Sequence, residues 1–169
     1  MIMRNKFVFA LATLVVLTLA TSASAAIINL SAMMDGPQAN AGAGTGSPGL
    51  GLATITLDDV TKQLSWDINW GGLLGSPSAM HFHGAALPNQ HAGVEIGTGV
   101  VGPPVIGNAI LDPGQESDLL AGLWYLNLHT SAFPGGEIRG QVLGIIPEPA
   151  TLALAGLGLS FIIAMRRKR

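Results

Sequence analysis

A strict alternation of apolar and polar residues near the middle of the chain is the feature that most limits its fold. Residues 53–57 alternate Ala, Ile and Leu with Thr, and residues 64–70 alternate Leu, Trp, Ile and Trp with Ser, Asp and Asn. Successive side chains of a β-strand point to opposite faces, so the pattern predicts two half-buried strands. Residues 58–63 would join them as a hairpin. The alternation also predicts that Trp66 and Trp70 lie in the core.

Other short apolar segments, separated by Gly and Pro, predict strands at residues 27–33, 79–83, 93–96, 105–111, 123–129 and 137–143. The one helical candidate is residues 116–121, closed by Gly122. The Gly-rich residues 36–49 are expected to hold no regular element and to be the least ordered part of the domain. Seven or eight short strands indicate an all-β fold, an antiparallel sandwich or barrel.

Residues 1–25 have the anatomy of a secretory signal peptide. Arg4 and Lys6 precede the apolar residues 7–20, and a stretch of small residues ends at Ala25. Cleavage is expected between Ala25 and Ala26, with the bond after Ala26 as the second choice. An uncleaved N-terminal anchor is the alternative, but the apolar run is shorter than the about 20 residues that a membrane span needs.

The segment of residues 145–169 is typical of a tail that enters a membrane. A Pro-Glu-Pro triplet precedes the uncharged residues 150–165, and four cations occupy residues 166–169. Residues 150–165 would form about 24 Å of helix at about 1.5 Å per residue. That length is slightly less than a hydrocarbon core of about 30 Å, but a transmembrane helix is still expected through local thinning and snorkelling. The cations should stay cytoplasmic, which leaves the domain outside. A plain tail anchor without processing is the alternative.

Three features of this tail stand in the order of a known sorting signal. The triplet Pro147, Glu148 and Pro149 is followed by the apolar stretch and then by the cations, and the tail resembles the PEP-CTERM family. The resemblance implies a transient inner-membrane anchor and a membrane-embedded exosortase, which cuts near the triplet and passes the protein to the cell surface or beyond. It also implies a Gram-negative bacterial host that makes extracellular polysaccharide.

Between the two signals, residues 26–144 form one domain by length. The domain holds two basic residues, Lys62 and Arg139, against nine acids, so its net charge is −7 with histidine neutral. It has no footprint for a phosphate backbone, which excludes nucleic acid as a partner. The chain has no cysteine, which excludes disulfides, zinc–thiolate sites and cysteine nucleophiles.

Three segments of this domain together resemble the CHRD domain. They are Gly-Leu-Ala-Thr-Ile-Thr-Leu-Asp leading to Leu-Ser-Trp in residues 51–66, Met-His-Phe-His-Gly-Ala in residues 80–85, and residues 118–141, which end in Phe-Pro-Gly-Gly-Glu-Ile-Arg-Gly-Gln. The resemblance covers essentially the whole domain. The sequence departs from the family pattern at Phe82 and in the Gly-rich residues 97–107. It implies an immunoglobulin-like β architecture in a family whose molecular activity is poorly defined.

The histidines supply the candidate site for chemistry. In residues 80–83 the apolar Met80 and Phe82 should face the core, so His81 and His83 should be exposed on the outer face. His129 should face outward from its own strand in the same way. Imidazoles two residues apart on a strand are a sound start for a metal site, which makes His81, His83 and His129 candidate ligands for Cu or Zn.

The outer faces of neighbouring strands should also carry Tyr125, Asn127, Glu137 and Arg139. Glu137 and Arg139 could join the histidines, depending on a strand order that the sequence does not fix. In the alternative to metal binding, the histidines form structural hydrogen bonds to Glu137, Asn127 or backbone groups.

Two functions are compatible with these patterns. The first is a non-enzymatic envelope or extracellular-matrix protein, with no catalytic residues and no cofactor, whose domain binds exopolysaccharide or another surface protein. The second is a Cu- or Zn-dependent redox enzyme that uses the exposed histidines. A His-x-His on a β-barrel is similar to copper–zinc superoxide dismutase in that motif alone, since the fuller histidine set and the disulfide of that enzyme have no counterpart here.

Overall fold

The structure, a computed structural model, describes residues 26–99 and 102–145. Within these residues it contains one α-helix, α1 (Pro113–Leu120), one short 3-10 helix, η1 (Asn40–Gly42), and nine strands. The strands are β1 (Ile27–Asp35), β2 (Leu50–Asp58), β3 (Gln63–Gly71), β4 (Pro77–Gly84), β5 (Gly93–Gly97), β6 (Val105–Ile110), β7 (Tyr125–Thr130), β8 (Ile138–Gln141) and β9 (Leu143–Gly144).

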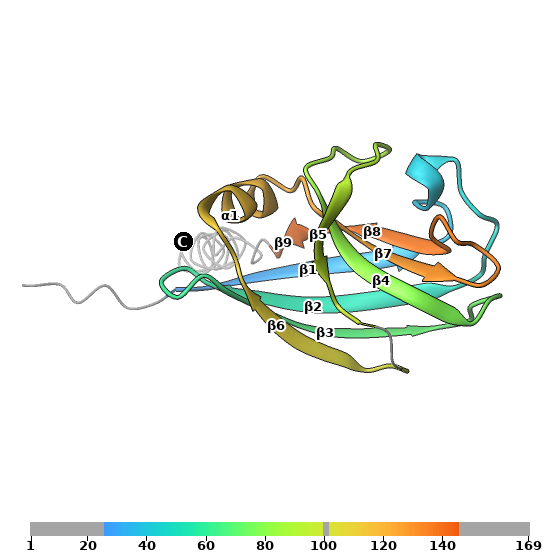
Figure 1. Ribbon diagram of the computed structural model, residues 1–169, viewed down its shortest axis with the longest axis horizontal. Helices are drawn as coiled ribbons and strands as arrows, with labels where there is room; N and C mark the ends of the chain where they lie inside the picture. The colour runs from blue at the N-terminus through green and yellow to red at the C-terminus, as the bar shows by residue number, and fades with distance from the viewer. Residues whose placement is uncertain (1–25, 100–101, 146–169) are drawn as a thin grey trace, which may run out of the picture.

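All strands belong to a single antiparallel sheet in the order β5-β4-β7-β8-β1-β2-β3-β6, with β9 paired to β1 outside this path. The sheet curls over itself into a nearly closed barrel, so that β4 and β7 lie across the interior from β2 and β3 (Figure 1). The all-β, antiparallel prediction is confirmed. One expected strand, residues 137–143, is divided at Val142 into β8 and β9, because the Val142 amide donates to the Trp124 carbonyl at 2.8 Å.

The two ends of the barrel differ. One end, which we call the loop end, carries the connections of residues 36–49, 72–76 and 131–137. The other, the helix end, carries α1 and the tight β2–β3 turn (Figure 1). Ile145 also lies toward this end, because its amide donates to the carbonyl of Asn29 near the start of β1. The hairpin predicted from the alternation is confirmed, since Leu57 pairs with Leu64 and Ala53 with Ile68.

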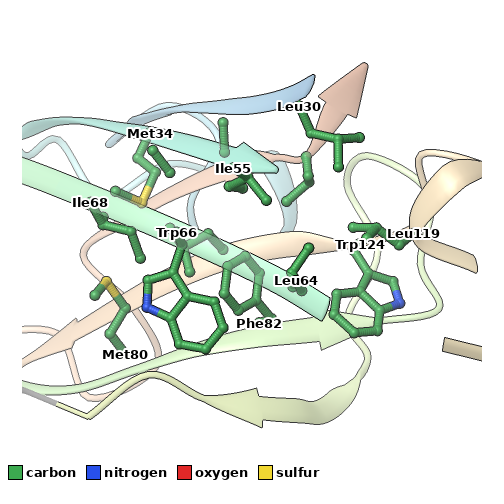
Figure 2. Packing of buried hydrophobic residues seen from close by; sticks show 14 of the residues in the cluster. Leu30, Met34, Ile55, Leu64, Trp66, Ile68, Met80, Phe82, Leu119 and Trp124 are labelled. Carbon is green, nitrogen blue, oxygen red and sulfur yellow. The ribbon is translucent and has the colours of Figure 1, made fainter. Parts of the chain in front are cut away.

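The inner face of the sheet forms the apolar core. Trp66 on β3 and Phe82 on β4 meet edge to face across the interior, with ring centroids 5.3 Å apart, and Leu119 of α1 lies beside Trp124 near the helix end (Figure 2). Gly107 on β6 lies opposite Trp66, and a Cβ atom there would lie 2.6 Å from the indole ring. The prediction for Trp66 is confirmed. That for Trp70 is wrong, because Trp70 lies near the end of β3 and packs against the core only in part.

The helix begins earlier than the sequence predicts. Asp112 caps it by accepting hydrogen bonds from the Gly114 and Gln115 amides, and the Gln115 side chain bonds back to the Asp112 amide, a reciprocal capping box. Pro113 occupies the first turn, where its missing N–H costs nothing. Gly122, at φ +73°, ends the helix as expected in the left-handed conformation that glycine adopts without strain.

The Gly-rich residues 36–49 are attached to the barrel by hydrogen bonds to Glu137. They contain η1, whereas the sequence predicted no regular element there. The Thr45 hydroxyl donates to the Glu137 carbonyl at 2.8 Å, and the Ser47 hydroxyl donates to the Glu137 carboxylate at 2.6 Å. Composition alone could not show these contacts, because their partner is about 90 positions away in the chain.

The predicted signal peptide, the sorting triplet and the transmembrane helix of residues 150–165 lie outside the described residues. Within residues 26–99 and 102–145, no helix combines the length and the apolar character needed to cross a bilayer.

The inward and outward alternation generates a stability prediction. Trp66→Ala should lower the free energy of unfolding by about 3–5 kcal/mol, as a large-to-small change in a packed core does. Thr54→Ala, at an exposed position of β2, should change it by no more than about 0.5 kcal/mol. Denaturant titration of both variants measures the difference, and similar losses at the two positions would contradict the assignment of faces.

Candidate functional site

The candidate site lies on the outer face of β4 and β7. Met80 and Phe82 are buried in the barrel interior, as predicted, so His81 and His83 lie on the opposite face of β4. His81 pairs with Asn127 and His83 with Tyr125 across the β4–β7 ladder. Because His129 stands two residues beyond Asn127 on the same face, the register brings His129 next to His81.

The structure brings the three predicted histidines together. The ring centroids of His81 and His83 are 5.6 Å apart, those of His81 and His129 are 5.2 Å apart, and those of His83 and His129 are 6.0 Å apart. One ring nitrogen from each residue lies within 4.8 Å of the other two. We call these three residues the histidine cluster. His91 does not join it, since it lies exposed in the β4–β5 loop.

Two of the three imidazoles are oriented by backbone carbonyls. His83 Nδ1 is 3.1 Å from the Ala92 carbonyl, and His129 Nδ1 is 2.8 Å from the Pro134 carbonyl. His129 Nε2 also lies 3.3 Å from the side-chain amide nitrogen of Asn127. Two of the rings therefore make hydrogen bonds of the kind that the alternative to metal binding predicted, to backbone carbonyls and to Asn127.

The outer face is covered around His83, which corrects the expectation that His83 is exposed, while His81 and His129 are half-buried. His83 is only 8% exposed, Tyr125 2% and Arg139 3%. The His83 ring stacks on the Tyr125 ring at 4.9 Å, and the Arg139 guanidinium carbon lies 3.5 Å from the centroid of the Tyr125 ring. The β4–β5 loop of residues 85–92 covers this stack by accepting hydrogen bonds from Arg139 at the Gln90 carbonyl and from Gln141 at the Ala86 carbonyl.

Burial lowers the pKa of two of these histidines, His81 and His83. Removal from water lowers the pKa of His81 below its ordinary value, and the neighbouring His129 lowers it further. Burial also lowers the pKa of His83, although the hydrogen bond to the Ala92 carbonyl opposes this effect. Both rings are therefore neutral near pH 7, the form in which an imidazole has a free lone pair.

Glu137 does not join the cluster, against one arrangement that the sequence allowed. Its carboxylate is fully buried at the loop end and accepts four hydrogen bonds. The donors are the hydroxyls of Ser47 and Thr130 and the amides of Leu74 and Gly75. Burial raises the pKa of Glu137, but these four bonds outweigh it and hold the pKa below its ordinary value. Glu137 thus fastens three loops that sequence reasoning left separate.

These features define a class of protein, an antiparallel β-barrel-like domain with a covered polar cluster on its outer face. Comparison with known families assigns it further. Residues 30–142, most of the chain, match the CHRD domain, and residues 146–169 match the PEP-CTERM protein-sorting motif. The chain belongs to the CHRD domain family. Searches of curated proteins and of solved structures find no match.

The second match determines where the protein goes. The PEP-CTERM motif marks proteins that are exported, held for a time in the membrane and processed by an exosortase before they reach the cell surface or the extracellular space. Neither matched family is an enzyme family.

The Glu137 contacts generate a pH prediction. Because the folded-state pKa of Glu137 is below its ordinary value of 4.5, its carboxylate stabilises the fold above that pH, and this stabilisation is lost as the pH falls through the folded-state pKa. Glu137→Gln should therefore destabilise the protein at pH 7 by more than about 1 kcal/mol, since bonds to a charged group contribute about 1.5–3 kcal/mol each.

Glu137→Gln should also lose less stability than the wild type as the pH is lowered from 5 through the folded-state pKa of Glu137. Chemical denaturation across this range measures both effects, with Asp67→Asn at an exposed position of β3 as the control. Parallel pH profiles for Glu137→Gln and the wild type would contradict this role of the carboxylate.

Proposed function

We propose that this protein is a non-enzymatic component of the cell surface or extracellular matrix, whose CHRD domain binds a macromolecule there, an exopolysaccharide or another surface protein. The observation that carries the proposal is the direct succession of the domain and its sorting signal. The last strand, β9, ends at Gly144, and the sorting motif begins at residue 146. The sorting signal thus carries this domain to the outside.

The position of β9 gives the displayed domain an orientation. β9 pairs with Leu30 and Ser31 of β1, and the Ile145 amide donates to the Asn29 carbonyl, which places the exit of the chain at the helix end. A domain anchored through this exit presents its helix end to the membrane. The loop end then faces away from the membrane, toward the matrix.

A hollow at the loop end is the surface that suits a partner best. It is lined by Asn40, Gly44 and Thr45 of the Gly-rich segment and by residues 132–136 of the β7–β8 loop, including Phe133. An aromatic ring beside backbone and side-chain amides is suited to an uncharged or weakly charged polymer, such as a polysaccharide. The net charge of −7 on the domain disfavours polyanions at the same surface.

The redox-enzyme alternative finds no support in either family match. The β4–β5 loop covers His83, and Glu137 forms its hydrogen bonds at the loop end and not beside the histidine cluster. We therefore propose no reaction for this domain.

A location prediction follows from the sorting signal. A chain truncated after residue 146 should leave the membrane fraction and accumulate as a folded, exported protein, because every strand of the core lies upstream. Glu148→Ala in the full chain should impair processing and leave the fold unchanged. Fractionation of an exosortase-containing host with immunoblotting measures both. An unchanged distribution of the truncated form would contradict sorting by this tail.

A binding prediction tests the proposed role itself. Phe133→Ala should weaken co-sedimentation of the full chain with matrix polysaccharide from its host by at least about tenfold, which corresponds to about 1.4 kcal/mol. The control is Val60→Ala, which removes an exposed apolar side chain at the opposite end of the barrel. Equal binding by wild type and both variants, or no binding by any, would reject the loop-end surface as the binding site.

A further inference from the structure

We propose that His81, His83 and His129 form a binding site for one transition-metal ion, Zn²⁺ or Cu²⁺, between β4 and β7 on the outer face of the barrel. The inference is independent of the proposed function, because a surface protein can bind its partner with or without this ion. It rests on the spacing of the donor atoms, on the orientation of the rings and on buried nitrogens that lack partners.

The spacing of the donors is close to that of a metal site. Three ring nitrogens, one from each histidine, lie within 4.8 Å of one another. Nitrogens bound to a common Zn²⁺ at about 2.0–2.1 Å in tetrahedral geometry lie about 3.3 Å apart. The donor atoms therefore have to approach one another by no more than about 1.5 Å to bind a common ion.

The hydrogen bonds of two rings fix the tautomer that a metal needs. A carbonyl oxygen can only accept, so the Ala92 carbonyl requires a proton on His83 Nδ1, and the Pro134 carbonyl requires one on His129 Nδ1. Each ring then presents the lone pair of Nε2. An imidazole whose second nitrogen donates to a carbonyl is the usual outer-shell arrangement of a metal ligand.

Buried nitrogens without partners point to a missing ligand. Among the described residues, six buried side-chain nitrogens and oxygens have no hydrogen-bond partner, and four of them lie on this face. They are His81 Nδ1, His83 Nε2, Asn127 Oδ1 and Arg139 Nη2. Unpaired buried polar atoms are rare in folded proteins and call for a partner such as an ion or a water. One metal ion would engage both imidazole nitrogens.

The chemistry of the donors selects the ion. The set consists of three imidazoles and no carboxylate, a combination that suits Zn²⁺ and Cu²⁺ and disfavours Mg²⁺ and Ca²⁺, which prefer oxygen ligands. The ring of Tyr125 stands between the cationic Arg139 and His83, which limits repulsion of a bound cation. His129 Nε2 must exchange its contact with the Asn127 amide for the metal, and that amide keeps its bond to the Gly135 carbonyl.

An ion can reach the cluster from solvent. His81 and His129 are only half-buried, and His81 borders an open hollow lined by Ser78, Gly97 and Gly99. Three protein ligands leave at least one coordination position of the ion for water or for an external ligand.

The test is metal binding by the full chain, purified in detergent without a polyhistidine tag. Equilibrium dialysis against Zn²⁺, followed by elemental analysis, should give one ion per chain, and dialysis against Mg²⁺ should give none. Cu²⁺ should bind at the same site and be displaced competitively. The bound ion should raise the unfolding temperature, because a ligand that binds only the folded state stabilises it.

The decisive variant is His81→Gln. The Nδ1 atom of His81 has no partner, so the change removes no hydrogen bond there, and circular dichroism should show an unchanged fold. The affinity for Zn²⁺ should fall by at least about 100-fold, the upper limit of the loss caused by an outer-shell change. His91→Gln, in the exposed loop, is the matched control and should bind like the wild type.

Three results would overturn the proposal. The first is that neither Zn²⁺ nor Cu²⁺ binds saturably with a Kd below about 0.1 mM, which corresponds to a binding free energy of about −5.5 kcal/mol. The second is that His81→Gln binds Zn²⁺ as the wild type does. The third is that His91→Gln loses as much affinity as His81→Gln. The first of these would assign the unpaired nitrogens to ordered water. None of the three would affect membrane release or polysaccharide binding, so failure of the metal site and failure of the proposed function are separable.

Discussion

The contact between Trp66 and Phe82 is the interaction on which the rest of the structure depends. A curled sheet must bury one face completely, and these two rings, 5.3 Å apart, bridge its opposite walls. With Phe82 inside, the two-residue period of the strand leaves His81 and His83 no choice of face. A shift of β4 by one residue would put both imidazoles into the core and both apolar side chains outside. The packing of the interior therefore determines the chemistry of the exterior.

The outer face is organised around Tyr125. Its ring is stacked by His83 and by the Arg139 guanidinium, an arrangement in which a cation is attracted to an aromatic face. Two backbone carbonyls of the β4–β5 loop then accept hydrogen bonds from this layer, one from Arg139 Nη1 and one from the Gln141 side-chain amide. Strands β4, β7 and β8 are thus covered on both faces. Apolar side chains pack on the inner face, and a layer of polar side chains lies on the outer face. Each layer limits the positions that the other can take.

The sequence predicts which face of a strand each side chain occupies better than it predicts whether that face is covered by other parts of the chain. Alternation is a local property, so the hairpin and the faces of His81, His83 and His129 are predicted correctly. Burial of the outer face depends on residues 85–92 folding back over β7 and β8, a long-range event that no local pattern encodes. The position of Glu137 depends in the same way on three loops that meet only in the folded chain. The alternation predicts that Trp70 is buried, but Trp70 lies near the end of β3 and is only partly buried against the core.

The short connection between β9 and the sorting motif limits how the tail can be reached. Glu148 is three residues beyond Ile145, and an extended chain of that length spans no more than about 10 Å. An exosortase that acts at the triplet therefore works almost in contact with a folded barrel, unless the chain upstream gives way. β9 can give way, because it is a strand of two residues attached to β1 alone. Detaching β9 would lengthen the link between the barrel and Glu148 from three residues to six, and the only strand pair broken would be that between β9 and β1.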